Sequence, residues 1–249
     1  KPMDVAPHPH IGLQTVTWLL EGEIIHHDSL GCEGLIRPGG VNVMTAGNGI
    51  AHAEETPRDN SGVLNGTQLW VALPESQRKI APSFQHIEKV PEVELRGGLA
   101  QVFAGTFCGI TSPAQYFSEI IGADLAVHSG AELTLQLNQS HEHALLLLAG
   151  DVGIEGLAID EKNLYYLGIG RSEIGFASRA GARLLLIGGR PFSETILMWW
   201  NFVARTPEEI AEARTAWENR QGFGEVKAYQ GPRLNAPPLA KLSRPNPAS

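Results

Sequence analysis

Short apolar segments recur along the chain at intervals of roughly ten residues, the spacing typical of β-sandwiches and barrels. Four segments in the first half are rich in apolar side chains: residues 14–20, 41–44, 66–74 and 99–108. Glycine and proline separate them. Glu21-Gly22 is a tight-turn signal, so we predict a hairpin between residues 14–20 and 23–27. The pattern therefore predicts an all-β chain.

The same pattern begins again near Ser112-Pro113. Its apolar segments cover residues 115–126, 132–137, 144–148, 165–169 and 184–188. Both halves contain a leucine-rich strand, a glycine turn and a return strand, around residues 19–23 and 148–152. We interpret this as an internal duplication of one barrel. The expected domains are 1–112, 113–192 and a C-terminal region over 193–249.

The C-terminal region carries the clearest helical signal. Thr206-Pro207-Glu208-Glu209 has the form of a capping box with proline at the first helical position. Ile210, Ala213 and Trp217 follow at helical spacing, and Gly222 is a stop signal. The proline-rich residues 231–249 lack any periodicity. We predict one short helix packed on a barrel and an extended tail.

Composition narrows the class of protein. The chain has 249 residues, 43% hydrophobic content and a net charge of -8. The acidic balance argues against direct binding to nucleic acid, which requires a basic face. No apolar run has the length of a membrane span, so we expect no membrane partner. Two cysteines and no visible signal peptide favour a reducing, cytoplasmic location. Because the chain starts at Lys1, close to the first candidate ligand, we expect residues before it to be missing.

The candidate chemistry lies in two short motifs, His8-Pro9-His10 and His52-Ala53-Glu54. Residues two apart on a strand point to the same face, so each motif presents two ligands together. If the two strands face each other across a barrel, four ligands converge on one ion. Three imidazole nitrogens and one carboxylate oxygen suit Fe, Zn, Ni, Cu or Mn, and not Ca or Mg.

A similar motif, His141-Glu142-His143, lies in the second half. The downstream residues 176–187 contain no His, Cys, Asp or Glu. Two ligands rarely form a metal site, so we interpret this pair as a degenerate copy without metal.

Three other features have ordinary interpretations. We expect His26 and His27 to be exposed polar residues that point to opposite faces of a strand. Cys32 has no basic neighbour in sequence that would activate its thiol. Cys108 is predicted to be a core residue.

The residues 8–22, which read HPHIGLQTVTWLLEG, and 44–54, which read MTAGNGIAHAE, resemble the two motifs of the pirin family within the cupin superfamily. Residues 69–74 and the segment from Asn201 into the capped helix are also similar. The resemblance implies a bicupin, in which two antiparallel jelly-roll barrels lie face to face and the first one holds a metal. It places the ligands at His8, His10, His52 and Glu54. Gln14 stands where most cupins have a ligand glutamate, and we expect it to be a hydrogen-bond partner of the site.

The resemblance also implies a function. Pirins include quercetin 2,3-dioxygenases, so we expect a planar polyphenol and O2 as substrates, with Glu54 as catalytic base. Fe(II) is the first expected metal, and Zn, Ni, Cu and Mn are alternatives. A second hypothesis is a non-enzymatic, metal- or redox-sensing regulator that binds a protein partner. A deep apolar cavity over the metal would favour the enzyme, and a plugged site would favour the regulator. We expect a monomer.

Overall fold

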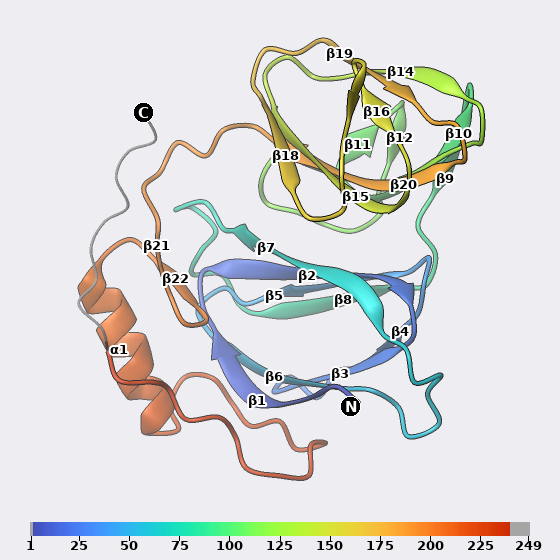
Figure 1. Cartoon of the computed structure of the whole chain (residues 1–249). Coiled ribbons are helices and arrows are strands. Elements are labelled where there is room, and N and C mark those ends of the chain that lie inside the picture. Colours follow the sequence, from blue (N-terminus) through green and yellow to red (C-terminus); the bar gives the residue numbers. More distant parts are fainter. Residues whose placement is uncertain (1, 240–249) are drawn as a thin grey trace. The chain divides into compact units, whose positions relative to one another are not determined.

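Strands dominate the computed structural model, which describes residues 2–239 (Figure 1). The chain divides into two units. The first combines the residues up to Glu88 with those from Ser193 onward, and the second is Lys89–Phe192. The all-β prediction is confirmed.

The first unit contains two four-stranded antiparallel sheets. One has the order β1 (Asp4–His10), β6 (Ile50–Glu55), β3 (Ile24–Asp28) and β4 (Glu33–Ile36). The other has the order β7 (Asn65–Ala72), β2 (Leu13–Glu21), β5 (Val41–Thr45) and β8 (Ser83–Ile87). Figure 1 shows these sheets as two layers of one sandwich.

The first two crossings between these sheets occur at glycines. Gly12 (φ +69°) separates β1 from β2, and a Cβ there would lie 2.1 Å from the Val203 carbonyl oxygen. Gly22 (φ +85°) separates β2 from β3. The predicted hairpin across Glu21-Gly22 is therefore wrong, because β2 pairs with β5 and β7 while β3 pairs with β4 and β6. The turn carries the chain from one layer of the sandwich to the other.

The second unit also has two principal sheets. Six strands follow the order β18 (Leu164–Gly168), β15 (Glu142–Gly150), β20 (Ala182–Gly189), β13 (Ile120–Val127), β10 (Gly98–Ala104) and β9 (Glu92–Leu95). Four follow the order β14 (Glu132–Gln136), β19 (Glu173–Ala177), β16 (Gly153–Ile154) and β17 (Leu157–Ala158). A hairpin joins β11 (Thr106–Phe107) and β12 (Ile110–Thr111). Buried Val, Leu, Ile and Phe side chains form the core of this unit.

The division between the units differs from the expected boundary at residue 112. The strands β9 and β10 pair with each other, and β10 pairs with β13 over Gly98–Ala104. These hydrogen bonds place residues 92–104 in the sheet of the second unit. A strand-length pattern alone does not say which sheet a strand joins.

The C-terminal segment completes the first unit. It contains β21 (Leu197–Trp199), β22 (Phe202–Ala204) and α1 (Pro207–Glu218). The predicted N-cap is confirmed, since Thr206 accepts a hydrogen bond from Glu209 N, while the Glu209 carboxylate accepts from Arg205 N. The aromatic residues Phe202, Trp217 and Phe223 pack with Ala51 and Ala53 of β6. The segment thus covers one face of the strand that carries His52 and Glu54.

The start of the predicted tail is an ordered strap on this unit. Leu234 N donates to the Pro7 carbonyl oxygen (2.9 Å), and Trp217 Nε1 donates to the Leu234 carbonyl oxygen (2.9 Å). The guanidinium of Arg233 lies 4.1 Å from the centre of the Trp217 ring. The remainder of the tail, residues 240–249, lies outside the described residues. Within residues 2–239, no helix has the length and apolar character needed to cross a membrane.

Candidate metal centre

Three neighbouring strands bring the polar site together. In the sheet register, His8 of β1 lies opposite His52 of β6, and His52 lies opposite Asp28 of β3. Glu54 lies opposite His26 of β3. The sequence-based picture of two strands facing each other across a barrel is therefore wrong in detail. The strands are hydrogen-bonded neighbours, and opposed residues of neighbouring strands share one face with short Cβ separations.

The spacing of the nitrogens fits a metal ion. The Nε2 atoms of His10 and His52 are 3.0 Å apart. Two nitrogens that bind one ion at about 2.1 Å each, at a right angle, also lie about 3.0 Å apart. Potential ligand atoms of His8, His10 and His52 all lie within 4.8 Å of one another. A second such group within residues 2–239 contains His26, His52 and Glu54.

Burial keeps the three histidines in the form that binds metals. Desolvation lowers the pKa of His8, and it lowers the pKa of His10 and His52 far more strongly. Repulsion between these rings lowers the pKa of His10 and His52 further. A neutral imidazole offers a lone pair, so the folded protein provides ligands that need not lose a proton first.

The second nitrogens of His8 and His52 have contacts of their own. His8 Nδ1 lies 2.9 Å from the Ala6 carbonyl oxygen. His10 Nδ1 is buried without a hydrogen-bond partner within residues 2–239, although the nearby Asn201 backbone partly opposes the lowering of the His10 pKa. His52 Nδ1 lies 3.4 Å from His26 Nδ1. Contacts of this kind fix the orientation of ligating histidines in metal sites.

Glu54 is a buried carboxylate that belongs to the second group, with His26 and His52, and not to the group of His8, His10 and His52. Gln68 Nε2 of β7 donates to Glu54 Oε1 (2.8 Å) and lies 3.2 Å from the Thr17 hydroxyl oxygen. Burial raises the pKa of Glu54, and the hydrogen bond from Gln68 opposes that rise. A carboxylate with a raised pKa accepts a proton more readily than an exposed one.

A cavity of about 410 Å³ reaches this site. His8 and Glu54 contribute to its wall together with Thr17, Thr67 and Gln68. The remaining side chains are mostly apolar: Met3, Val5, Leu19, Ile24 and Leu64. Its volume lies within the range of about 300–1,000 Å³ usual for small-molecule sites.

His26 is the participant that the sequence interpretation missed. Both His26 and His27 are buried rather than exposed. His27 lies near the carboxylates of Glu33 and Glu55, whereas His26 contacts His52 and Asp28. The two-residue spacing of His26 and Asp28 repeats the spacing of the ligand motifs, and this signal was available in the sequence.

Gln14 lies in the interior of the first unit. It is fully buried on β2, and its Nε2 donates to the Thr45 hydroxyl (3.0 Å). This contact ties β2 to β5 within the sheet opposite the histidines. Its expected role as a hydrogen-bond partner of the site remains a prediction.

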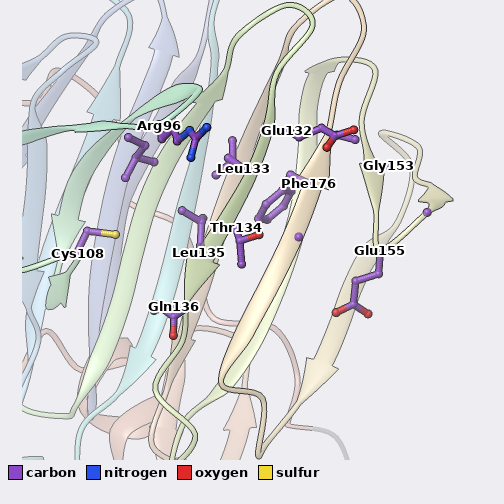
Figure 2. Close-up of a pocket in the computed structure, with 14 residues that line it drawn as sticks. Arg96, Cys108, Glu132, Leu133, Thr134, Leu135, Gln136, Gly153, Glu155 and Phe176 are labelled. Atoms are coloured by element: carbon purple, nitrogen blue, oxygen red, sulfur yellow. The ribbon is translucent and has the colours of Figure 1, made fainter.

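The second unit has no comparable cluster within residues 89–192. His141 and His143 are buried, but their ring centres are 6.1 Å apart. A groove of about 850 Å³ lies elsewhere in this unit, and its described lining contains no histidine (Figure 2).

Cys108 lines this groove and is exposed, so its predicted core position is wrong. Partial burial raises the pKa of its thiol, which disfavours the reactive thiolate.

Comparisons with known proteins agree with this arrangement. Residues 2–71 match the family described as Pirin, and residues 122–224 match the family described as the pirin C-terminal cupin domain. The Pseudomonas aeruginosa protein named "Putative quercetin 2,3-dioxygenase PA1205" is 48% identical over 238 residues, or 94% of this chain and 75% of that protein. A "Pirin-like protein" of Caulobacter vibrioides is 36% identical over 223 residues, or 88% of this chain and 76% of that protein.

A solved structure shares the fold along nearly the whole chain. The crystal structure of quercetin 2,3-dioxygenase from Acinetobacter baumannii matches with a TM-score of 0.94 and 42% identity. The match covers 97% of this chain and 81% of that one. The molecule is thus an all-β protein with two cupin domains, a bicupin. Its chain belongs to the pirin family.

Proposed function

We propose that the chain is a metal-dependent dioxygenase that cleaves a flavonol such as quercetin with O2. His8, His10, His52 and Glu54 would hold one divalent transition metal. Fe(II) is the first expectation, and the same donors accept Zn(II), Ni(II), Cu(II) and Mn(II). The names of the Pseudomonas and Acinetobacter relatives support this activity.

The observation that carries the proposal is the apolar cavity over the site. His8 and Glu54 lie at a wall made largely of Met3, Leu19 and Leu64. An apolar pocket with a few convergent polar groups is the usual form of a small-molecule site. A planar polyphenol fits this description, because its rings contact the apolar wall while its hydroxyl groups reach the polar end.

The expected reaction consumes one flavonol and one O2 and releases carbon monoxide with ring cleavage. When bound, the ion supplies a Lewis-acid centre and, if it is redox-active, a path for electrons. The chain binds the substrate rings against the apolar wall of the cavity and positions a base. Glu54 is that base, and it accepts the proton of the flavonol 3-hydroxyl.

Glu54 is suited to this role by its surroundings. Burial raises the pKa of its carboxyl group, and this shift favours proton uptake at neutral pH. Gln68 holds one carboxylate oxygen and leaves the other available to substrate or metal. Ligation to a cation would lower the pKa again, so the base acts best when its hold on the ion is weak.

The test is anaerobic reconstitution with each divalent metal, followed by quercetin turnover with O2. We expect turnover with Fe(II), and a loss of about 100-fold in kcat for Glu54→Gln. Glu55→Gln is the matched control, because Glu55 is the next residue on β6 and faces His27 instead. Metal content is measured for every variant, so that loss of the ion is not mistaken for loss of the base. Failure of fully loaded protein to consume quercetin would refute the proposal.

The alternative of a regulator with a protein partner predicts a different outcome. It requires metal binding without turnover and a shallow or plugged site. The cavity of about 410 Å³ next to Glu54 favours the enzyme.

A further inference from the structure

A chain of polar contacts leads from His52 away from the candidate metal position. His52 Nδ1 lies 3.4 Å from His26 Nδ1, and His26 Nε2 lies 3.2 Å from Asp28 Oδ2. The other oxygen, Asp28 Oδ1, accepts the backbone N–H groups of Leu30 (2.8 Å) and Cys32 (2.9 Å). All three side chains in this chain of contacts are buried.

The His26 ring is held in place on its face as well as at its edges. It stacks on Phe84 of β8 with ring centres 4.1 Å apart and an interplanar angle of 3°. Phe84 belongs to the opposite sheet, so the His26 ring packs between the two sheets of the first unit. His26 is therefore built into the fold with one orientation, and both of its nitrogens are engaged.

Asp28 determines which atom donates and which atom accepts in each of these hydrogen bonds. Burial acts to raise the pKa of this carboxyl group, but hydrogen bonds from His26, Cys32 and Leu30 outweigh burial and lower it. An ionised carboxylate only accepts hydrogen bonds, so the proton between Asp28 and His26 is on His26 Nε2. In the neutral ring, His26 Nδ1 is then an acceptor, and His52 Nδ1–H must donate to it.

This order leaves the lone pair of His52 on Nε2, the atom that lies 3.0 Å from His10 Nε2. We propose that Asp28 and His26 are positioning residues that hold His52 in the tautomer whose Nε2 binds the metal. The inference rests on the metal centre proposed above. His26 is not itself a ligand in this arrangement, because both of its nitrogens already have partners.

The decisive variant is Asp28→Asn. The two backbone N–H groups keep the Asn oxygen in place, so its amide N–H points at His26 Nε2. The hydrogen bonds then reverse: His26 Nδ1–H donates to His52 Nδ1, and the proton of His52 moves to Nε2. In metal-free protein labelled with ¹⁵N in histidine, the imidazole spectrum should show His52 protonated at Nδ1 in the wild type and at Nε2 in the variant. The same tautomer in both proteins would overturn the inference.

Metal affinity gives the second readout. We expect Co(II) to bind Asp28→Asn about 10- to 100-fold more weakly than wild type, as is usual when an outer partner of a ligand is lost. The d–d absorption band of bound Co(II) should also shift. His27→Gln is the matched control, because His27 is the next residue on β3 and contacts Glu33 and Glu55 instead. Its affinity should stay within about two-fold of wild type.

A double variant separates positioning from support of the Asp28 turn. Asp28→Asn acts through the His26 ring, so adding it to His26→Gln should weaken Co(II) binding no further. Independent, additive losses would mean that Asp28 acts only on the local turn, and they would overturn the inference.

If wild type takes up no Co(II) and no Fe(II), both the proposed metal centre and the positioning role are refuted. If wild type binds metal but turns over no quercetin, the dioxygenase proposal fails while the positioning role stands.

Discussion

The same two-histidine spacing occurs in both cupin domains, but the residues opposite the histidines differ. In the first unit, His8 on β1 lies opposite His52 on β6. In the second unit, His143 on β15 lies opposite Gly188 on β20 and Gly168 on β18. A Cβ on Gly188 would lie 2.9 Å from the His143 ring and 2.4 Å from the Glu142 carbonyl oxygen. The second unit thus has a histidine pair with no side chain opposite His143.

The difference shows what a two-residue spacing alone can specify. Spacing puts two imidazoles on one face of a strand, but the cross-strand register decides what stands beside them. His8 has a third imidazole beside it, and one strand further along lies the carboxylate of Asp28. His143 has glycines on both sides. A metal centre in this fold is therefore a property of three neighbouring strands.

The largest expected effect comes from removing the cross-strand partner. His52→Ala should lower metal affinity by more than about 100-fold, beyond the usual effect of losing an outer partner. His143→Ala should leave affinity unchanged. Metal content of the purified variants, measured by elemental analysis after chelation and reconstitution, tests both. Equal losses in the two variants would contradict the distinction between the units.

Metal binding should stabilise one unit selectively. A ligand at 100 times its Kd adds about 2.7 kcal/mol to the free energy of unfolding of the state that binds it. We expect hydrogen exchange to slow in peptides from β6 and to stay unchanged in peptides from β20. Equal slowing in both strands would indicate a second metal site or strong coupling between the units.

Acid should destabilise the metal-free first unit more than the second. The pKa values of His10 and His52 are far below 6.5 in the folded state, so below pH 6.5 the unfolded state binds more protons. The free energy of unfolding therefore decreases as the pH is lowered below 6.5, because each of these histidines takes up a proton when the chain unfolds. Glu54 acts in the opposite direction, because its raised pKa lets the folded state take up a proton.

In the second unit, burial and His141 lower the pKa of His143, so some loss is expected there too. Hydrogen exchange at several pH values, corrected for the intrinsic rate, measures the two losses separately. A first unit that is no more acid-sensitive than the second would contradict the burial of three neutral histidines.

The smallest effect is expected at Cys108. Its side chain is exposed at the groove of the second unit, so Cys108→Ser should change the free energy of unfolding by less than about 0.5 kcal/mol. A core cysteine would cost considerably more, because the hydroxyl would be buried. Chemical denaturation of the two proteins distinguishes these positions.

The two sequence motifs led to the prediction of four ligands, and the structure brings His8, His10 and His52 together while it groups Glu54 with His26 and His52. The two-residue rule predicted that His8 and His10 share a face, and that His52 and Glu54 do so as well. It could not give the register that places the two strands side by side. We predicted that His26 is exposed because the alternation rule assumes that one face of a strand contacts solvent. In the structure, both faces of β3 are covered. The boundary at residue 112 failed for a related reason, since the pairing of β10 with β13 is a long-range contact.

The covering of β6 by the C-terminal segment has a consequence for how the geometry of the candidate site can be altered. Ala51 and Ala53 pack under Phe202, Trp217 and Phe223, while their neighbours His52 and Glu54 face the interior. Substitutions of Ala51 or Ala53 can therefore shift β6 by small amounts while the candidate ligands His52 and Glu54 stay the same. Changes in these packing residues are a gradual way to adjust the positions of the two candidate ligands without replacing either of them.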